Sequence, residues 1–167
     1  MFIRREKPSD ATEIDQVHRE AFDGDEPAEV ALVRQMRDSG ALLTNLSFVA
    51  EADGKIVGHI AISRARVGNV PVLALGPIGV VPELQRGGVG AALMHAAIGA
   101  ADALDELLIG LLGHLEYYPR FGFVLGSEVG VAPDEASWAS HFQVRTLTAW
   151  TPKSAGTFRY SDEFYAL

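Results

Sequence analysis

The stretch QRGGVG, Gln85 to Gly90, restricts the fold more than any other feature of the sequence. It follows an apolar run and precedes AALMHAAIGAA, whose small and apolar residues recur with a helical period. Glycine loses more backbone freedom on folding than any other residue, so three glycines in four positions indicate a need for bare backbone. Between a strand and a helix N-terminus, successive N–H groups and the helix dipole favour a phosphate or pyrophosphate. A turn that merely allows close packing is the alternative interpretation.

The elements around this loop predict an α/β domain with a mixed central sheet. We expect six to seven strands and about four helices. Strands are predicted at residues 1–7, in a hairpin over 47–67 that turns at Asp53-Gly54, at 69–82, at 106–113 and at 143–150. Helices are predicted after Pro8-Ser9-Asp10, with Asp10 and Glu13 as an acidic capping box, over 27–39, after the glycine loop, and briefly within 114–124.

Composition excludes several classes of function. The chain has 167 residues, a formal charge of −8 and no cysteine. An acidic chain is poorly suited to neutralising nucleic-acid phosphates, and without cysteine there is no disulfide, thiolate nucleophile or cysteine zinc site. The five histidines form no metal-ligand pattern, and no apolar run approaches the ~18 residues of a membrane span. The N-terminus lacks a hydrophobic signal core, so we expect a cytoplasmic protein with no metal, membrane or nucleic-acid partner.

Two families of phosphate-binding loops do not fit the surrounding residues. A P-loop requires Gly-Lys-Ser/Thr, which is absent from the chain. A dinucleotide-binding fingerprint requires a third glycine where Leu93 stands. It also requires an acidic residue at the end of the next strand, whereas Asp105 and Glu106 precede that strand.

A third family fits. LGPIGVVPELQRGGVGAALM, with Gln85-x-x-Gly88-x-Gly90, resembles the acetyl-CoA-binding motif Q/R-x-x-G-x-G/A of the GNAT-type N-acetyltransferases. YYPRFGF, Tyr117 to Phe123, resembles a second hallmark segment of that superfamily. Together with EVALVRQMR, these segments look most like the YhbS-like acetyltransferases. The resemblance implies one acyl-CoA N-acyltransferase domain over 1–167, with a common core to about residue 150 and an aromatic tail, 151–167.

The resemblance implies a cofactor site at the loop and the strand before it. Gly76-Pro77 is expected to disturb strand pairing, because proline donates no ladder hydrogen bond, and to splay the sheet there. The pantetheine arm would pair with the freed backbone. The amide of Val80 would stabilise the oxyanion formed at the thioester carbonyl. The expected cofactor-binding residues are Ile78, Gly79, Val80, Gln85, Arg86, Gly87, Gly88, Val89 and Gly90.

The resemblance also assigns acid and base roles. Tyr118 would protonate the departing thiolate, because a phenol remains protonated at neutral pH; packing at a strand end is the alternative for both Tyr117 and Tyr118. Glu29 and His114 are the candidates for the base that deprotonates the amine, and a water chain is the other option. Further acids beside the loop between the first two helices are Asp23, Asp25 and Glu26.

The function implied is transfer of an acetyl group from acetyl-CoA to a primary amine of unknown identity by direct attack. This route needs no protein nucleophile, which agrees with the absence of cysteine and of a G-x-S-x-G motif. Two alternatives are a non-catalytic acyl-CoA-binding or regulatory domain and a transferase that uses a longer acyl-CoA. A homodimer is also compatible with the resemblance.

Overall fold

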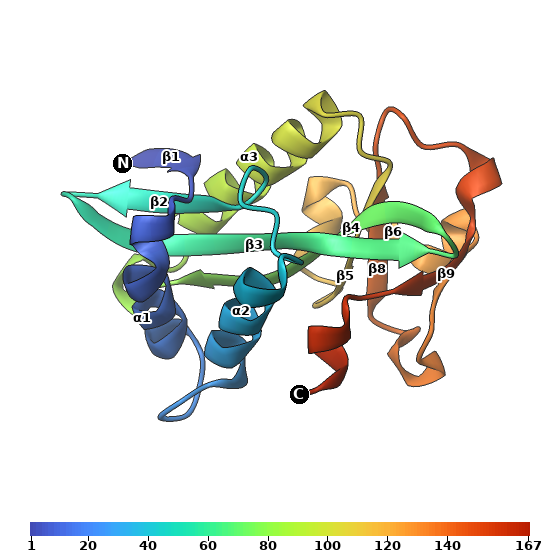
Figure 1. Cartoon of the computed structure of the whole chain (residues 1–167). Coiled ribbons are helices and arrows are strands. Elements are labelled where there is room, and N and C mark those ends of the chain that lie inside the picture. Colours follow the sequence, from blue (N-terminus) through green and yellow to red (C-terminus); the bar gives the residue numbers. More distant parts are fainter.

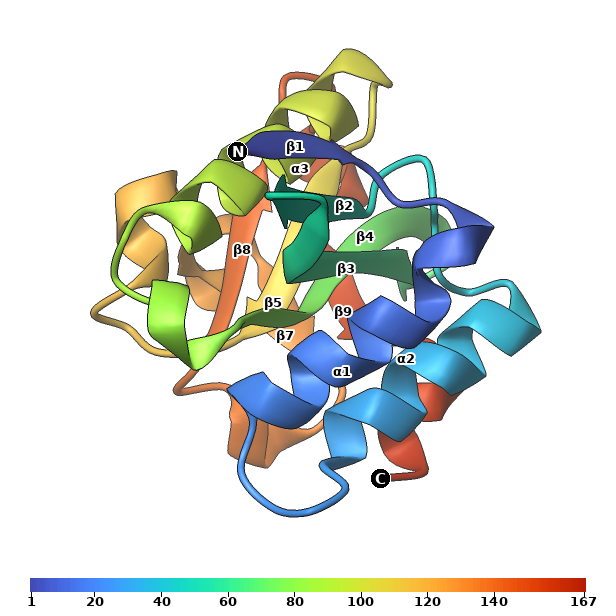
Figure 2. The same ribbon diagram turned by 90° about the vertical axis from the view of Figure 1, so that its left-hand side faces the viewer.

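The computed structural model describes all residues, 1–167, as a twisted mixed sheet with helices on both faces (Figure 1). Helix α3 lies on one face, and helices α1 and α2 lie side by side on the other (Figures 1 and 2). The helices are α1 (Ala11–Ala21), α2 (Ala28–Ser39) and α3 (Val89–Ala103). The strands are β1 (Phe2–Arg5), β2 (Phe48–Ala52), β3 (Lys55–Val67), β4 (Val70–Val80), β5 (Leu108–Leu112), β6 (Val124–Leu125), β7 (Val131–Pro133), β8 (Phe142–Thr146) and β9 (Gly156–Arg159).

Strand order in the main path is β1-β2-β3-β4-β5-β8-β6, and β9 joins β3 to β7. All pairs are antiparallel except β4 with β5 and β7 with β9. The predicted hairpin is confirmed, because β2 and β3 meet at Asp53 and Gly54, which both have positive φ. The predicted α/β class with a mixed sheet is therefore confirmed.

The numbers of elements differ from the expectation. The sheet has nine strands rather than six to seven, because β6, β7 and β9 are only two to four residues long and pair with segments distant in the sequence. There are three α-helices rather than four. The stretch 114–124 forms only a 3₁₀ turn, Tyr118–Phe121, between Pro119 at its start and Gly122 with φ 86° after it.

The start of α1 also differs from the expected capping box. Asp10 makes no side-chain cap hydrogen bond to the helix. Its carboxylate instead accepts hydrogen bonds from Arg4, at 2.8 and 3.0 Å, and from the backbone N–H of Lys7 at 2.7 Å. Arg4 lies close enough to Asp10 to form an ion pair with two hydrogen bonds. This pair is stronger than a hydrogen bond from an uncharged backbone N–H of the helix. The expected second helix is confirmed as α2, which Gly40 ends with φ 85°.

Side chains form separate apolar cores on the two faces of the sheet. The core under α3 includes Ile62, Leu73, Leu93 and Ile109. On the opposite face, α1 and α2 cover one core, and the aromatic C-terminal segment covers another. That segment reaches the sheet through β9, whose Phe158 is fully buried. The C-terminus consequently lies on the same face as α2 (Figure 2).

Candidate active site

Strands β4 and β5 are paired over a short stretch and then separate. Their pairing is limited to Leu73 with Ile109 and Ala74 with Gly110, whereas β4 continues to Val80. The expected splay is therefore present, and the edge of β4 that faces β5 is unpaired from Leu75 onward. We call this opening the β4–β5 fork.

The backbone of Val80 faces into the fork. The N–H of Val81 donates to the carbonyl of Val57 on β3 at 2.9 Å. Because alternate residues of an antiparallel strand bond to the same neighbour, the N–H and C=O of Val80 point away from β3. Ile78 shares this orientation, since the β3–β4 register is regular from Ile78 to Val80. Two backbone N–H groups are thus presented to anything that enters the fork.

Gln85 connects the glycine loop to this strand. Its side-chain amide donates to the carbonyl of Val80 at 2.9 Å. Because this bond uses the carbonyl, the N–H of Val80 is its remaining backbone polar group in the fork. Gln85 therefore holds the end of β4 in place, in addition to lying at the expected cofactor site.

The glycine loop delivers the N-terminus of α3 to the mouth of the fork. Gly88 is the N-cap with φ 91°, and the first intrahelical bond runs from the N–H of Ala92 to the carbonyl of Gly88 at 3.0 Å. The preceding N–H groups of the first turn have no helical acceptor. Arg86 also has a positive φ, of 63°, which is uncommon for a residue with a side chain and is concentrated at ligand sites.

The fork and the loop border one groove of about 560 Å³, which we call the donor groove. Its lining brings together many of the expected cofactor-binding residues. It is lined by Ile78, Val80, Gln85, Arg86, Gly88, Gly90, Ala91, Tyr117 and Arg120. Gly79, Gly87 and Val89 do not line it. Gly79 faces the other side of the sheet, and Val89, the first residue of α3, is buried.

The two tyrosines of YYPRFGF occupy different positions. Tyr117 lines the donor groove, and its hydroxyl lies so near Gly90 that a Cβ there would stand 3.2 Å from it. Tyr118 lies deeper, edge-on to Tyr117, and its ring leaves no room for a Cβ at Gly113. Burial raises the pKa of Tyr118 to about 12, and the neighbouring Tyr117 adds to the rise. The phenol of Tyr118 is therefore protonated throughout the physiological range.

Sequence reasoning missed Arg120 as part of this groove. Its guanidinium lies 4.7 Å from the ring centre of Tyr117 and donates to the carbonyl of Tyr117 at 2.9 Å. Arg120 and Arg86 thus place two positive charges beside the free N–H groups of α3. The arrangement suits a ligand with several negative charges.

The base candidates lie outside the donor groove. Glu29 is half-buried in the first turn of α2, and His114 is exposed just beyond β5. The carbonyl of His114 accepts the N–H groups of Tyr117 and Tyr118 at 3.3 and 3.4 Å, so His114 shapes the turn that carries these residues, which we call the tyrosine turn. Of the other acids, Asp23 and Asp25 are exposed, and Glu26 is paired with Arg19 at 3.0 Å.

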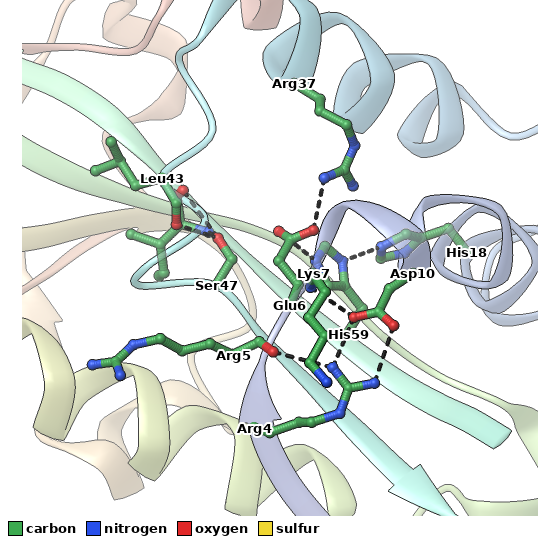
Figure 3. A network of polar contacts seen from close by, with 11 residues as sticks. Arg4, Arg5, Glu6, Lys7, Asp10, His18, Arg37, Leu43, Ser47 and His59 are labelled. Carbon is green, nitrogen blue, oxygen red and sulfur yellow. Dashed lines mark hydrogen bonds and ion pairs between the residues drawn. The ribbon is translucent and has the colours of Figure 1, made fainter. Parts of the chain in front are cut away.

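A buried chain of titratable groups lies behind the fork, and sequence reasoning did not assemble it (Figure 3). Arg37 donates to Glu6 at 2.7 Å, Glu6 lies 3.4 Å from Nε2 of His59, and Nδ1 of His59 lies 2.8 Å from Nε2 of His18. Glu6, His59 and His18 come from three different elements, so no local spacing reveals them. The other ring nitrogen of His18, Nδ1, is buried without a partner and would stand 2.8 Å from a Cβ at Gly79.

The protonation of this chain follows from its surroundings. Burial lowers the pKa of His18 to about 3, and the charge of His59 contributes, so His18 is neutral at pH 7. Burial alone would raise the pKa of Glu6, but hydrogen bonds and charges from His59 and Arg37 outweigh it and lower that pKa. Because Glu6 is ionised, Nε2 of His59 donates to its carboxylate.

No group of three or more histidine and carboxylate side chains is arranged to hold a metal ion. None of the helices combines the length and apolar character needed to cross a bilayer.

A parallel pair that opens into a fork, beside a glycine loop and a helix N-terminus, defines the chain as an acyl-CoA N-acyltransferase-like fold. Residues 44–125 match the acetyltransferase (GNAT) domain family. The chain is 35% identical over 166 residues to the uncharacterised N-acetyltransferase YjhQ of Escherichia coli K12, covering 92% of this chain and 88% of YjhQ. The chain belongs to the GNAT family of N-acetyltransferases, as the resemblance predicted.

Solved structures agree with this assignment. YhbS from Escherichia coli, solved in complex with CoA, matches with a TM-score of 0.88 and 27% identity, over 98% of this chain and 91% of that one. A GNAT family acetyltransferase from Brucella melitensis, solved in complex with acetyl-CoA, matches with a TM-score of 0.79 and 31% identity, over 98% and 97%. The expected likeness to YhbS is therefore confirmed.

Proposed function

We propose that this chain binds acetyl-CoA in the donor groove and transfers the acetyl group to a primary amine. One observation carries the proposal: the unpaired edge of β4 leads directly into the glycine loop at the N-terminus of α3. The pantetheine arm would extend the sheet along Ile78 to Val80, and the pyrophosphate would lie on the N–H groups from Arg86 to Gly90. The complexes of YhbS with CoA and of the Brucella protein with acetyl-CoA support the choice of acetyl-CoA as the ligand.

The chemistry proposed is direct attack. The neutral amine nitrogen forms a bond to the thioester carbonyl carbon, the carbon–sulfur bond breaks, and CoA leaves as a thiolate. The attacking nitrogen loses one further proton, which restores the phenol of Tyr118 after that residue has protonated the thiolate. The N–H of Val80 stabilises the oxyanion on the carbonyl oxygen, because it projects into the fork without a strand partner. Tyr118 gives its proton to the thiolate, since its raised pKa keeps it protonated.

The ammonium form of the acceptor must lose a proton before attack, and Glu29 and His114 are the proposed acceptors of that proton. Glu29 stands on the face of α1 and α2, and His114 stands beside the tyrosine turn. A water chain that serves instead of either residue is the alternative. Residues 1–167 act as one domain in this proposal, because β9 places the aromatic tail in the sheet. The cytoplasmic location and the homodimer stay predictions of the sequence.

The release of free CoA tests the proposal. Acetyl-CoA is mixed with the protein and a panel of primary amines, and the thiol of CoA is measured with time. Wild type should release CoA faster when an amine is added. Tyr118→Phe should lower kcat by about 100-fold, as expected for loss of a general acid, with the Kd of acetyl-CoA within about twofold of wild type. Leu104→Ala, on the exposed end of α3, is the control that should match wild type.

Two results would contradict the assignment. Wild-type turnover by Tyr118→Phe would remove the proposed acid. Binding of acetyl-CoA without release of CoA for any amine would instead favour the non-catalytic binding domain.

A further inference from the structure

A second hollow lies at the same fork, and the mechanism above does not use it. Its volume is about 260 Å³. It is lined by Leu75, Gly76, Pro77, Leu112, Trp138, Tyr160, Phe164 and Leu167. Three of these residues belong to the aromatic C-terminal segment, whose place in the function the sequence left open. We call this hollow the aromatic pocket.

The aromatic pocket opens on the face of the sheet opposite the donor groove. Ile78 and Val80 pack against the core under α3. On β5, Ile109 and Leu111 belong to that same core, so Gly110 and Leu112 face the other side. The ring of Phe158 confirms this, because it fills the space beside Gly110 on that side. The strands separate between the two hollows, so a group held at the fork is accessible from both faces.

The position along the strands brings the pocket close to the Ile78 end of the proposed donor arm. Extending the parallel register from Ala74 and Gly110 sets Gly76 level with Leu112, and both residues line the pocket. Gly76 lies two residues before Ile78, where the proposed donor arm runs. An acceptor that enters from this face therefore approaches the Ile78 end of the proposed donor arm.

Tyr160 links the pocket to Tyr118. Its side chain is only 5% exposed, and its hydroxyl lies at the backbone of Leu112. Burial raises the pKa of Tyr160, and the nearby phenols of Tyr165 and Tyr118 add to the rise. The ring of Tyr118 packs against Gly113, which follows the pocket-lining residue Leu112 in the chain. The wall of the aromatic pocket is thus adjacent to the proposed acid.

The chemistry of the lining is apolar. The rings of Tyr160 and Phe164 stack with centres 4.3 Å apart, and Trp138 meets Tyr160 edge-on at 5.9 Å. No charged side chain lines the pocket. The adjacent carboxylate of Asp134 is occupied, because it accepts the hydroxyl of Tyr165 at 2.8 Å and pairs with Arg159 at 3.1 Å. Such a surface binds apolar groups favourably and offers little stabilisation to a second charged group on the acceptor.

The size restricts what enters. An apolar cavity of about 150 Å³ holds a benzene molecule, so about 260 Å³ accepts one aromatic ring or a short branched chain. It is smaller than the usual range for a whole drug-sized ligand, so it holds part of a substrate.

We infer that the aromatic pocket binds a compact apolar or aromatic group on the acceptor amine, and so selects such amines over polar ones. This inference rests on the proposed function, because it places the acceptor at the fork. The shared chemistry is a primary amine separated from the apolar group by a short linker. A small aromatic amine and a peptide with an apolar N-terminal residue both supply it.

Competing amines test the inference. The kcat/KM for phenethylamine should exceed that for ethanolamine by at least about 50-fold, since even one methylene in an apolar pocket is worth about 10-fold or more. Phe164→Ala should reduce this ratio by at least about tenfold, mainly through the KM of phenethylamine. Leu112→Ala, at a site 38% exposed, should reduce it in the same direction and is the safer variant for folding. Leu104→Ala should leave the ratio unchanged.

A second comparison separates the two sources of the acceptor. The dipeptides Phe-Gly and Ser-Gly are assayed beside the small amines. Preference for Phe-Gly over phenethylamine identifies a peptide N-terminus, and the reverse identifies a small amine. Two results would overturn the inference. One is a ratio of kcat/KM near one both for phenethylamine over ethanolamine and for Phe-Gly over Ser-Gly, and the other is a ratio that Phe164→Ala and Leu112→Ala leave unchanged.

A binding measurement keeps the inference distinct from the proposed function if no amine is acetylated. In a Trp150→Phe background, the fluorescence of Trp138 reports on the pocket. With CoA bound, phenethylamine should change this emission at a concentration at least about tenfold lower than ethanolamine needs. Phe164→Ala should abolish this difference in concentration. Equal effects of the two amines would overturn the pocket assignment, whereas failure of turnover alone would overturn only the transfer reaction.

Discussion

At the scale of residues, the buried chain from Arg37 to His18 is the most demanding part of the molecule. A buried polar atom without a partner costs about 1–3 kcal/mol, and Nδ1 of His18 is such an atom. Gly79 is needed opposite it, because a Cβ would stand 2.8 Å from that nitrogen. The arrangement persists because Glu6 and His59 fix the His18 ring by hydrogen bonds (Figure 3).

His18 makes stability depend on pH. The pKa of His18 in the folded protein is about 3, well below the ordinary value of 6.5, so the unfolded chain binds the proton first. The stability that the protein gains from keeping His18 neutral is therefore fully present above about pH 6.5. It is lost as the pH falls toward 3, by up to about 1.4 kcal/mol per pH unit. The free energy of unfolding, measured with urea between pH 7 and pH 5, should fall with that sign. Glu6, whose pKa is lowered, adds a loss of the same sign only below its ordinary value of 4.5.

The matched variant is His18→Asn, which is polar but does not titrate in this range. Its free energy of unfolding should be lower than that of wild type at pH 7, and the difference between the two free energies should be smaller at pH 5. Parallel pH profiles for the two proteins would show that His18 is not held neutral by the fold.

At the scale of elements, the N-terminus of α3 carries the proposed phosphate site and makes a specific demand on Gly88. Its φ of 91° is a conformation that a β-branched residue rarely adopts, although no atom within 4 Å blocks a side chain. A substitution there therefore acts through backbone strain and through the cover that a side chain places over the free N–H groups.

We predict that Gly88→Val lowers the free energy of unfolding by about 1–3 kcal/mol and removes the rise in melting temperature caused by acetyl-CoA. Gly99→Ala is the control, because Gly99 lies inside the same helix with open space around it. It should stabilise the protein by about 0.5–1 kcal/mol and keep the response to acetyl-CoA. A full response to acetyl-CoA in Gly88→Val would contradict the assignment of the loop.

The same elements show what local sequence can predict. The Asp53-Gly54 turn, the end of α2 at Gly40 and the break near Gly76-Pro77 were each predicted, because glycine readily adopts positive φ and proline donates no ladder hydrogen bond. The strands β7 and β9 were not, because each is short and is stabilised by a partner distant in the sequence. Long-range pairing leaves no periodic pattern in such short segments.

At the scale of the whole molecule, the fork has a hollow on each face of the sheet. The donor groove lies on the face that α3 covers, and the aromatic pocket lies on the face that α1, α2 and the C-terminal segment cover. Motif spacing predicted the donor side, because its groups are backbone atoms of one continuous stretch. It could not predict the aromatic pocket, whose walls come from β4, β5 and the tail.

The most direct test of the central claim is calorimetric titration of the protein with acetyl-CoA and with acetyl-pantetheine, which lacks the pyrophosphate. The loop from Arg86 to Gly90 and the two arginines at the groove predict saturable one-to-one binding of acetyl-CoA. They also predict binding of acetyl-pantetheine that is at least about tenfold weaker, a difference of about 1.4 kcal/mol. Equal affinity for the two ligands, or no heat with millimolar acetyl-CoA, would contradict the account.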